Sequence, residues 1–182
     1  MTSSVEGGEV VVRPMRGGDV PRLAEVLNGW FASYVDHLDY RPGVLAFLDA
    51  TLGWSEGPSA VAEDAHGLVG ALVGGFRQAE WQGEGLRVVN LGVLAVSPRA
   101  RRQGVASALD EAFVARGAAG GADLVTLLTQ EIYRSHRFYD ARGYRVVQRF
   151  QPFGAAIGEV DRVPGLLEVD AATFRRAMPR PE

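Results

Sequence analysis

A strand that runs into a helix through a glycine-containing turn is the feature that most constrains this chain. The apolar run at residues 86–96 has no helical period, which predicts a buried central strand. Ser97-Pro98 ends it, and an amphipathic helix is predicted over residues 102–116 with Gly104 near its start. A helix start beside a glycine exposes backbone N–H groups that can bind an anion. The segment therefore predicts an α/β fold with an anion site.

Three arginines crowd the predicted start of this helix: Arg99, Arg101 and Arg102. The helix dipole is positive at that end, so cations there raise the energy unless an anion lies among them. We therefore expect a bound phosphate group. The alternative is a merely solvated basic turn.

The rest of the chain predicts a mixed α/β domain. The helical periods and apolar runs predict helices at residues 19–34, 44–54, 133–142 and 171–178, and strands at residues 10–12, 59–63, 68–76, 124–128, 144–150 and 166–169. Residues 78–85 are polar and glycine-rich, which predicts a loop. We expect one domain over residues 1–182, with frayed ends at residues 1–9 and 178–182.

Composition excludes several classes of protein. The chain has no cysteine, which rules out disulfides, thiolate nucleophiles and cysteine metal sites. All 19 basic residues are arginine, so the lysine that phosphate-loop NTPases, protein kinases and pyridoxal-phosphate enzymes require is missing. The three histidines show no metal-binding spacing, and we expect no metal. A net charge of −3 gives no general attraction to nucleic acid.

Two motifs resemble those of the GNAT superfamily of N-acetyltransferases. The family's acetyl-CoA motif is matched by Leu94-Ala95-Val96-Ser97-Pro98 followed by Arg101-Arg102-Gln103-Gly104-Val105-Ala106. Its second motif, a helix bearing Tyr-x-x-x-Gly-aromatic, is matched by Tyr139-Asp140-Ala141-Arg142-Gly143-Tyr144. The resemblance extends over residues 10–150. It implies a GNAT-like fold: a central, mostly antiparallel sheet with one splayed parallel pair, flanked by helices.

The resemblance also implies acetyl-CoA as cosubstrate and suggests which residues bind it. The backbone of Leu94, Ala95 and Val96 would pair with the pantetheine arm, and the Leu94 N–H would polarise the thioester carbonyl. The amides of residues 102–107 would hold the pyrophosphate. Arg134 and His136 are candidates for phosphate contacts, with ordinary exposed helix positions as the alternative. The full expected set is Leu94, Ala95, Val96, Arg101, Arg102, Gln103, Gly104, Val105, Ala106, Ser107, Arg134, His136 and Tyr139.

Tyr139 occupies the family's general-acid position. A phenol is protonated at neutral pH and can give its proton to the departing thiolate. The alternative is that Tyr139 simply packs beside Phe138. No covalent enzyme intermediate is expected.

The general base stays open among Glu131, Glu84, His37 and a water chain. The position where some family members carry a glutamate is Asn90, which cannot act as a base. Ile132 stands where the family often has an asparagine.

Aromatic and acidic side chains at the end of the first predicted helix and in the polar loop suit a cationic amine. The candidates for acceptor binding are Trp30, Tyr34, Asp36, His37 and Trp81. Trp30 and Tyr34 also lie on the apolar stripe of the predicted helix, so packing in the core is the alternative.

The leading hypothesis is an N-acetyltransferase that transfers acetyl from acetyl-CoA to a primary amine of a small molecule by direct attack. The alternatives are a protein N-terminal or lysine acetyltransferase and a non-catalytic acetyl-CoA-binding module. The sequence shows no signal peptide and no membrane span, so we expect a cytoplasmic protein without membrane or nucleic-acid partners. A homodimer is left open.

Overall fold

A computed structural model describes residues 3–5, 8–31, 46, 49–50, 53–81, 83–130, 135–150 and 171–177. The chain forms two compact units, Met1–Val125 with Ala177–Glu182 and Thr126–Arg176. The boundary falls within one strand, and each unit is described by itself. The expectation of a single domain stays a prediction.

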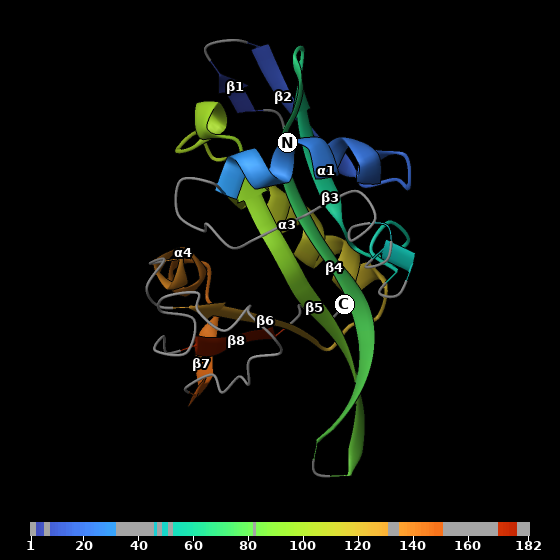
Figure 1. Cartoon of the computed structure of the whole chain (residues 1–182). Coiled ribbons are helices and arrows are strands. Elements are labelled where there is room, and N and C mark those ends of the chain that lie inside the picture. Colours follow the sequence, from blue (N-terminus) through green and yellow to red (C-terminus); the bar gives the residue numbers. More distant parts are fainter. Residues whose placement is uncertain are drawn as a thin grey trace, which may run out of the picture. The chain divides into compact units, whose positions relative to one another are not determined.

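The first unit contains five strands in chain order, each antiparallel to the next (Figure 1). They are β1 (Ser3–Val5), β2 (Gly8–Pro14), β3 (Ala60–Asp64), β4 (Gly67–Trp81) and β5 (Glu84–Val96). The expectation of a frayed start at residues 1–9 is wrong for Ser3–Val5, which pairs with β2. Backbone pairing in a sheet orders a terminal segment that would otherwise fray.

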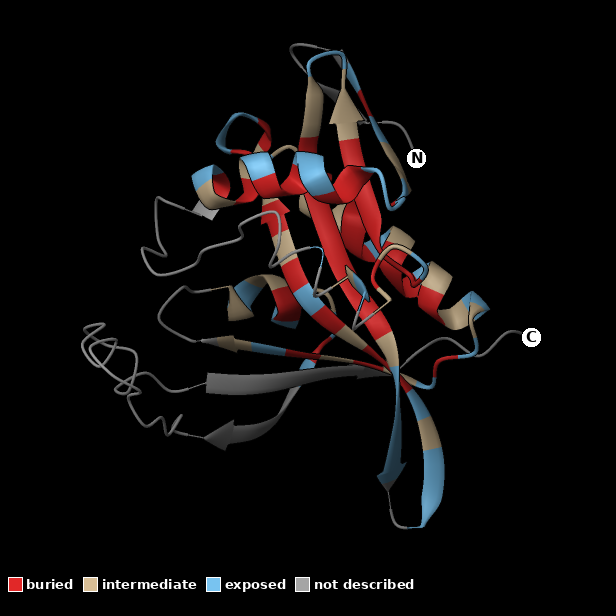
Figure 2. Ribbon diagram, turned by 45° about the vertical axis from the view of Figure 1, so that its right-hand side comes forward, coloured by how far each residue is buried: buried red, intermediate tan, exposed pale blue. Residues whose placement is uncertain are grey.

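β4 and β5 form a hairpin that is longer than the sequence predicts. The ladder runs from Gly70 opposite Val96 to Trp81 opposite Glu84. The loop expected at residues 78–85 is therefore wrong, because most of it is strand. Its end is exposed and extends beyond the buried part of the sheet (Figure 2).

Helices α1 (Asp19–Phe31) and α3 (Val105–Ala119) cover opposite faces of this sheet. Neighbouring residues of β4 show this, because Gly70 lies against Leu109 of α3 whereas Ala71 faces the side chains of α1. α1 buries Val20, Leu23, Leu27 and Trp30 of the apolar stripe predicted for it, together with Ala24. α3 starts at Val105, later than expected, with Gly104 just before it and a short 3-10 turn at Pro98–Ala100.

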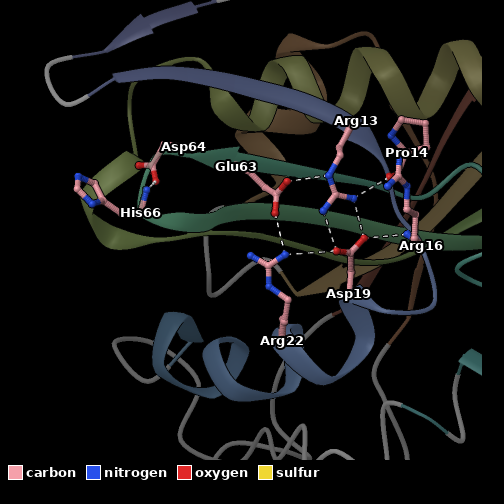
Figure 3. Close-up of polar contacts among 8 residues, drawn as sticks. All are labelled: Arg13, Pro14, Arg16, Asp19, Arg22, Glu63, Asp64 and His66. Atoms are coloured by element: carbon pink, nitrogen blue, oxygen red, sulfur yellow. Dashed lines mark hydrogen bonds and ion pairs between the residues drawn. The ribbon is translucent and has the colours of Figure 1, made fainter.

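An ion network fixes the start of α1 (Figure 3). Arg13 of β2 donates to both carboxylate oxygens of Asp19 at 2.7 Å and to Glu63 of β3 at 2.7 Å. Arg22 pairs with Glu63 at 2.9 Å. Asp19 also accepts from the Arg16 N–H, which ties the turn before the helix to its first residue. The hydrogen bonds from Arg13 hold the pKa values of Asp19 and Glu63 below their ordinary range.

The second unit contains most of β6 (Leu124–Gln130), with α4 (His136–Ala141), β7 (Arg145–Phe150) and β8 (Ala171–Ala177). β8 lies between β6 and β7 and is antiparallel to β7. The helix predicted at residues 171–178 is therefore wrong. Pairing with β7 overrides the helix propensity of its alanines and arginines.

Two predicted elements cannot be compared. The strand at residues 166–169 lies outside the described residues, as does most of the helix at residues 44–54. The same holds for the frayed end expected at residues 178–182. Within the described part of the chain, no helix is long and apolar enough to cross a membrane.

Candidate active site

A β-bulge in β5 lies two residues before Leu94. The register with β4 shifts by one between Val73 and Gly74, which leaves Gly92 as the extra residue. The indole of Trp54 packs over this point, because a Cβ at Gly92 would lie 3.1 Å from Trp54 Cζ2. The bulge changes which edge of β5 each later residue faces.

Backbone hydrogen bonds on both sides of the bulge fix the direction of Leu94. The Ser97 N–H donates to the Val69 carbonyl of β4 at 2.9 Å, so Leu94, three residues earlier, faces away from β4. Before the bulge, the N–H and C=O of Arg87 bond to Asp123 and also face away from β4. The N–H and C=O groups of successive residues in a strand face opposite edges. Without the extra residue, Leu94, seven positions after Arg87, would therefore face β4. The bulge therefore presents the Leu94 N–H at the edge away from β4.

The turn before α3, with the first turn of that helix, forms the loop at residues 101–107, here called the phosphate loop. Arg102 has φ 63° and Gly104 has φ 82°, both left-handed. A left-handed arginine is uncommon, and such backbone lines N–H groups along a concave surface that suits an anion. Among the described residues, the N–H groups of residues 102–107 meet no acceptor. The first turn of α3 carries no acidic side chain.

Arg99 already has an anionic partner within the protein. Its guanidinium forms a forked ion pair with Asp64 at the end of β3. That pair holds the pKa of Asp64 below its ordinary range. Arg102 is exposed, and its guanidinium has no partner in the part of the chain that the structure describes.

The Arg101 guanidinium is also engaged by the protein. Its Nε donates to the Val96 carbonyl at 3.0 Å, and a terminal nitrogen donates to the Trp30 carbonyl at 2.6 Å. The expectation that all three arginines require an anion is therefore wrong for Arg99 and Arg101. The amides of residues 102–107 and the exposed Arg102 guanidinium are therefore the groups that favour a phosphate here.

The phosphate loop fits a pyrophosphate. A Cβ at Gly104 would meet no atom within 4 Å, so the surface beside the amides is open. Gln103 ties the loop to the turn before it, because its Nε2 donates to the Arg99 carbonyl at 3.1 Å. Its Oε1 is buried and has no hydrogen-bond partner among the residues that the structure describes.

The second motif has a physical explanation in the second unit. α4 ends at Ala141, and Gly143 just beyond it has φ 82° and donates to the Asp140 carbonyl at 3.1 Å. The Tyr144 N–H donates to the Tyr139 carbonyl, and the two rings meet edge-to-face at 5.4 Å. Tyr139 is buried and also packs against Phe138, whose ring centroid is 5.2 Å away. The motif thus fixes the position of the Tyr139 ring within its unit.

His136 is the first residue of α4, and its Nδ1 is buried without a hydrogen-bond partner among the described residues. Arg134 and Glu131 lie outside the described residues, as do Tyr34, Asp36 and His37 of the expected acceptor site. Their roles stay predictions.

Glu84 does not fit the role of general base. It lies at the tip of the β4–β5 hairpin, and the ten residues of strand to Leu94 span roughly 30 Å. Trp81 pairs with Glu84 at the same tip, so its backbone is equally far from Leu94. Trp30 is 7% exposed in the face that α1 packs on the sheet. Trp30 therefore packs in the core, the alternative to a role in acceptor binding.

The sequence analysis missed the bulge and the residue that covers it. An isolated glycine in a strand pattern is a signal for a bulge, and Gly92 interrupts the apolar run. The packing of Trp54 over Gly92 has no such local signal, because the two residues are 38 positions apart in the chain.

Comparison with known proteins identifies the family of this chain. The acetyltransferase (GNAT) domain model matches residues 55–146, just over half of the chain. This span contains the bulge, the phosphate loop and the Tyr139 motif. No curated protein matches significantly.

Solved structures share the fold at low identity. Ard1 from Thermoplasma volcanium has a TM-score of 0.68 at 20% identity, over 94% of this chain and 99% of its own. A NatC complex bound to Gag peptide and CoA gives 0.69 at 17%, over 93% and 99%. The acetyltransferase yncA from Salmonella typhimurium, solved with its cofactor acetyl-CoA, gives 0.65 at 16%, over 93% and 94%.

The expected fold class, a mixed α/β GNAT fold, is confirmed by this likeness. The family match and the fold lead to the same identification. The chain belongs to the GNAT acetyltransferase family and is an acyltransferase whose cosubstrate is acetyl-CoA.

Proposed function

We propose that this protein transfers the acetyl group of acetyl-CoA directly to a primary amine. The observation that carries the proposal is the backbone of the first unit. The same strand presents the Leu94 N–H away from β4 and leads into the phosphate loop. Together these groups suit an acyl thioester at one end and a pyrophosphate at the other.

Bound acetyl-CoA supplies an acetyl thioester that is open to attack by an amine. The amides of residues 102–107, with the positive end of the α3 dipole, would hold the two negative charges of the pyrophosphate. The Leu94 N–H would donate to the thioester oxygen and stabilise negative charge that develops there. Backbone donors suit this task, because the sheet holds them in place before the reaction.

Two proton transfers complete the reaction. A base must take a proton from the amine as the C–N bond forms, and an acid must protonate sulfur as the C–S bond breaks. We assign the acid to the Tyr139 hydroxyl, whose ring is fixed by Phe138 and Tyr144. Glu131, His37 and a water chain remain the candidates for the base. Asn90 has no basic group for this task.

We propose a small-molecule primary amine as the first candidate acceptor. A peptide amine is the second candidate, favoured by the likeness to the NatC complex bound to Gag peptide and CoA. A non-catalytic acetyl-CoA-binding module is the third reading. The fixed Tyr139 ring favours catalysis over that reading.

Thiol release from acetyl-CoA tests the proposal. The panel contains small primary amines, peptides with a free N-terminus, and N-blocked peptides with one lysine. Release that depends on one class identifies the acceptor. Binding of acetyl-CoA without release, with any amine, would leave only the binding module.

A further inference from the structure

We propose that Arg101 is a positioning residue that ties the phosphate loop to the last turn of α1. Acetyl-CoA bound in the loop would thereby order that turn. The inference rests on the acetyl-CoA site proposed above. It extends that site to the end of α1, because Arg101 bonds to Trp30, 71 residues earlier in the chain.

The end of α1 needs a partner from elsewhere. The last four carbonyls of a helix receive no hydrogen bond from an N–H of the same helix. A cation near them is favourable, because that end of the helix dipole is negative. α1 has no basic residue in its last turn. The Arg101 guanidinium supplies one from the phosphate loop, through its 2.6 Å hydrogen bond to the Trp30 carbonyl.

The same guanidinium also holds the end of β5. Its Nε donates to the Val96 carbonyl at 3.0 Å, so one planar group joins strand, loop and helix. A lysine has the charge but not this fixed fork of donors. The backbone changes to a left-handed conformation at the next residue, Arg102. Arg101 is thus placed where the loop backbone turns.

A connection of this kind couples order in the two places. A pyrophosphate bound by the amides of residues 102–107 would restrict the loop backbone, including the residue that carries the guanidinium. The carbonyl at the other end of that side chain would lose freedom with it. Coupling is reciprocal, so a loosened α1 end should also weaken acetyl-CoA binding.

Arg99 offers a matched control. It lies in the turn that leads into the same loop, but its guanidinium pairs with Asp64. Its link is to the β3–β4 hairpin. Arg99→Gln therefore removes an arginine beside the loop without removing the contact to α1.

Hydrogen exchange of the whole protein, with and without saturating acetyl-CoA, tests the inference. In the wild type and in Arg99→Gln, acetyl-CoA should slow exchange both at residues 102–108 and at residues 27–31. In Arg101→Gln it should slow exchange at residues 102–108 only. Without acetyl-CoA, residues 27–31 should exchange about tenfold faster in Arg101→Gln, as expected for loss of a charge-assisted hydrogen bond.

Arg101→Lys keeps the charge and loses the fork, so it should behave like Arg101→Gln at residues 27–31. It also replaces the glutamine variant if that variant does not fold by circular dichroism. Equal slowing at residues 27–31 in wild type and both Arg101 variants would overturn the inference. So would a wild type in which only the loop responds. A wild type that does not bind acetyl-CoA by calorimetry would overturn the proposed function, and the inference with it.

Discussion

Replacing Gly104 by glutamate would place a negative charge at the mouth of the phosphate loop. A Cβ at this position meets no atom within 4 Å, so the free protein can accommodate the side chain. The left-handed φ of 82° costs an L residue roughly 1–2 kcal/mol. That strain is present with and without ligand, so it lowers stability more than affinity.

The loss of affinity comes from charge. A carboxylate about 5 Å from one pyrophosphate charge repels it by about 3 kcal/mol at an effective dielectric constant near 20. This corresponds to a dissociation constant for acetyl-CoA that is about 200-fold higher than in the wild type. Gly104→Gln has the same shape and backbone strain without the charge. We expect it to weaken binding less than about tenfold.

Isothermal titration calorimetry of both variants with acetyl-CoA checks this difference. Low ionic strength is needed, because salt screens the repulsion. Thermal unfolding should show equal stability of the two variants. Dissociation constants within threefold of each other would refute a pyrophosphate at this loop, whatever their distance from the wild type.

Three further predictions follow from other parts of the structure. Tyr139→Phe should keep the affinity for acetyl-CoA and lower kcat about 100-fold, and wild-type turnover would remove Tyr139 as the acid. Asp19→Asn should lower the free energy of unfolding by about 2 kcal/mol, because it removes the charge from a partly buried, two-pronged ion pair with Arg13. Because the pKa values of Asp19 and Glu63 are lowered, their stabilisation is complete above about pH 5 and lost as the pH falls further. Urea unfolding between pH 3 and 7 should therefore show a slope that Asp19→Asn reduces. Gly120→Ala should cost about 1 kcal/mol in thermal unfolding, because its Cβ would lie 2.3 Å from Phe76 Cζ, and Phe76→Leu should relieve most of that cost.

The buried elements could be predicted because apolar periodicity reports burial. The stripe of α1 and the apolar run of β5 both have it. The end of the β4–β5 hairpin lacks an apolar face, since Arg77, Gln78 and Glu80 are exposed, and only its backbone ladder makes it a strand. The helix predicted at residues 171–178 was wrong for a related reason. Pairing with β7, rather than its own composition, makes this segment the strand β8.

The strand end, turn and helix start around residues 96–105 could be predicted because their signal is local: an apolar run, Ser-Pro and a glycine within a dozen residues. The roles of the arginines could not. Arg101 reaches a backbone carbonyl 71 residues away, and sequence carries no signal for a bond to a carbonyl. Glu84 does not suit the role of general base, because one continuous strand separates it from Leu94. The length of that strand places Glu84 far from the Leu94 N–H.

Calorimetric titration of the purified wild type with acetyl-CoA, with ATP as the control, tests the central claim most directly. We predict one site with micromolar affinity for acetyl-CoA and no binding of ATP, because the strand that carries Leu94 would add contacts to the pantetheine arm. Absence of acetyl-CoA binding, or equal binding of ATP, would contradict the donor site described here.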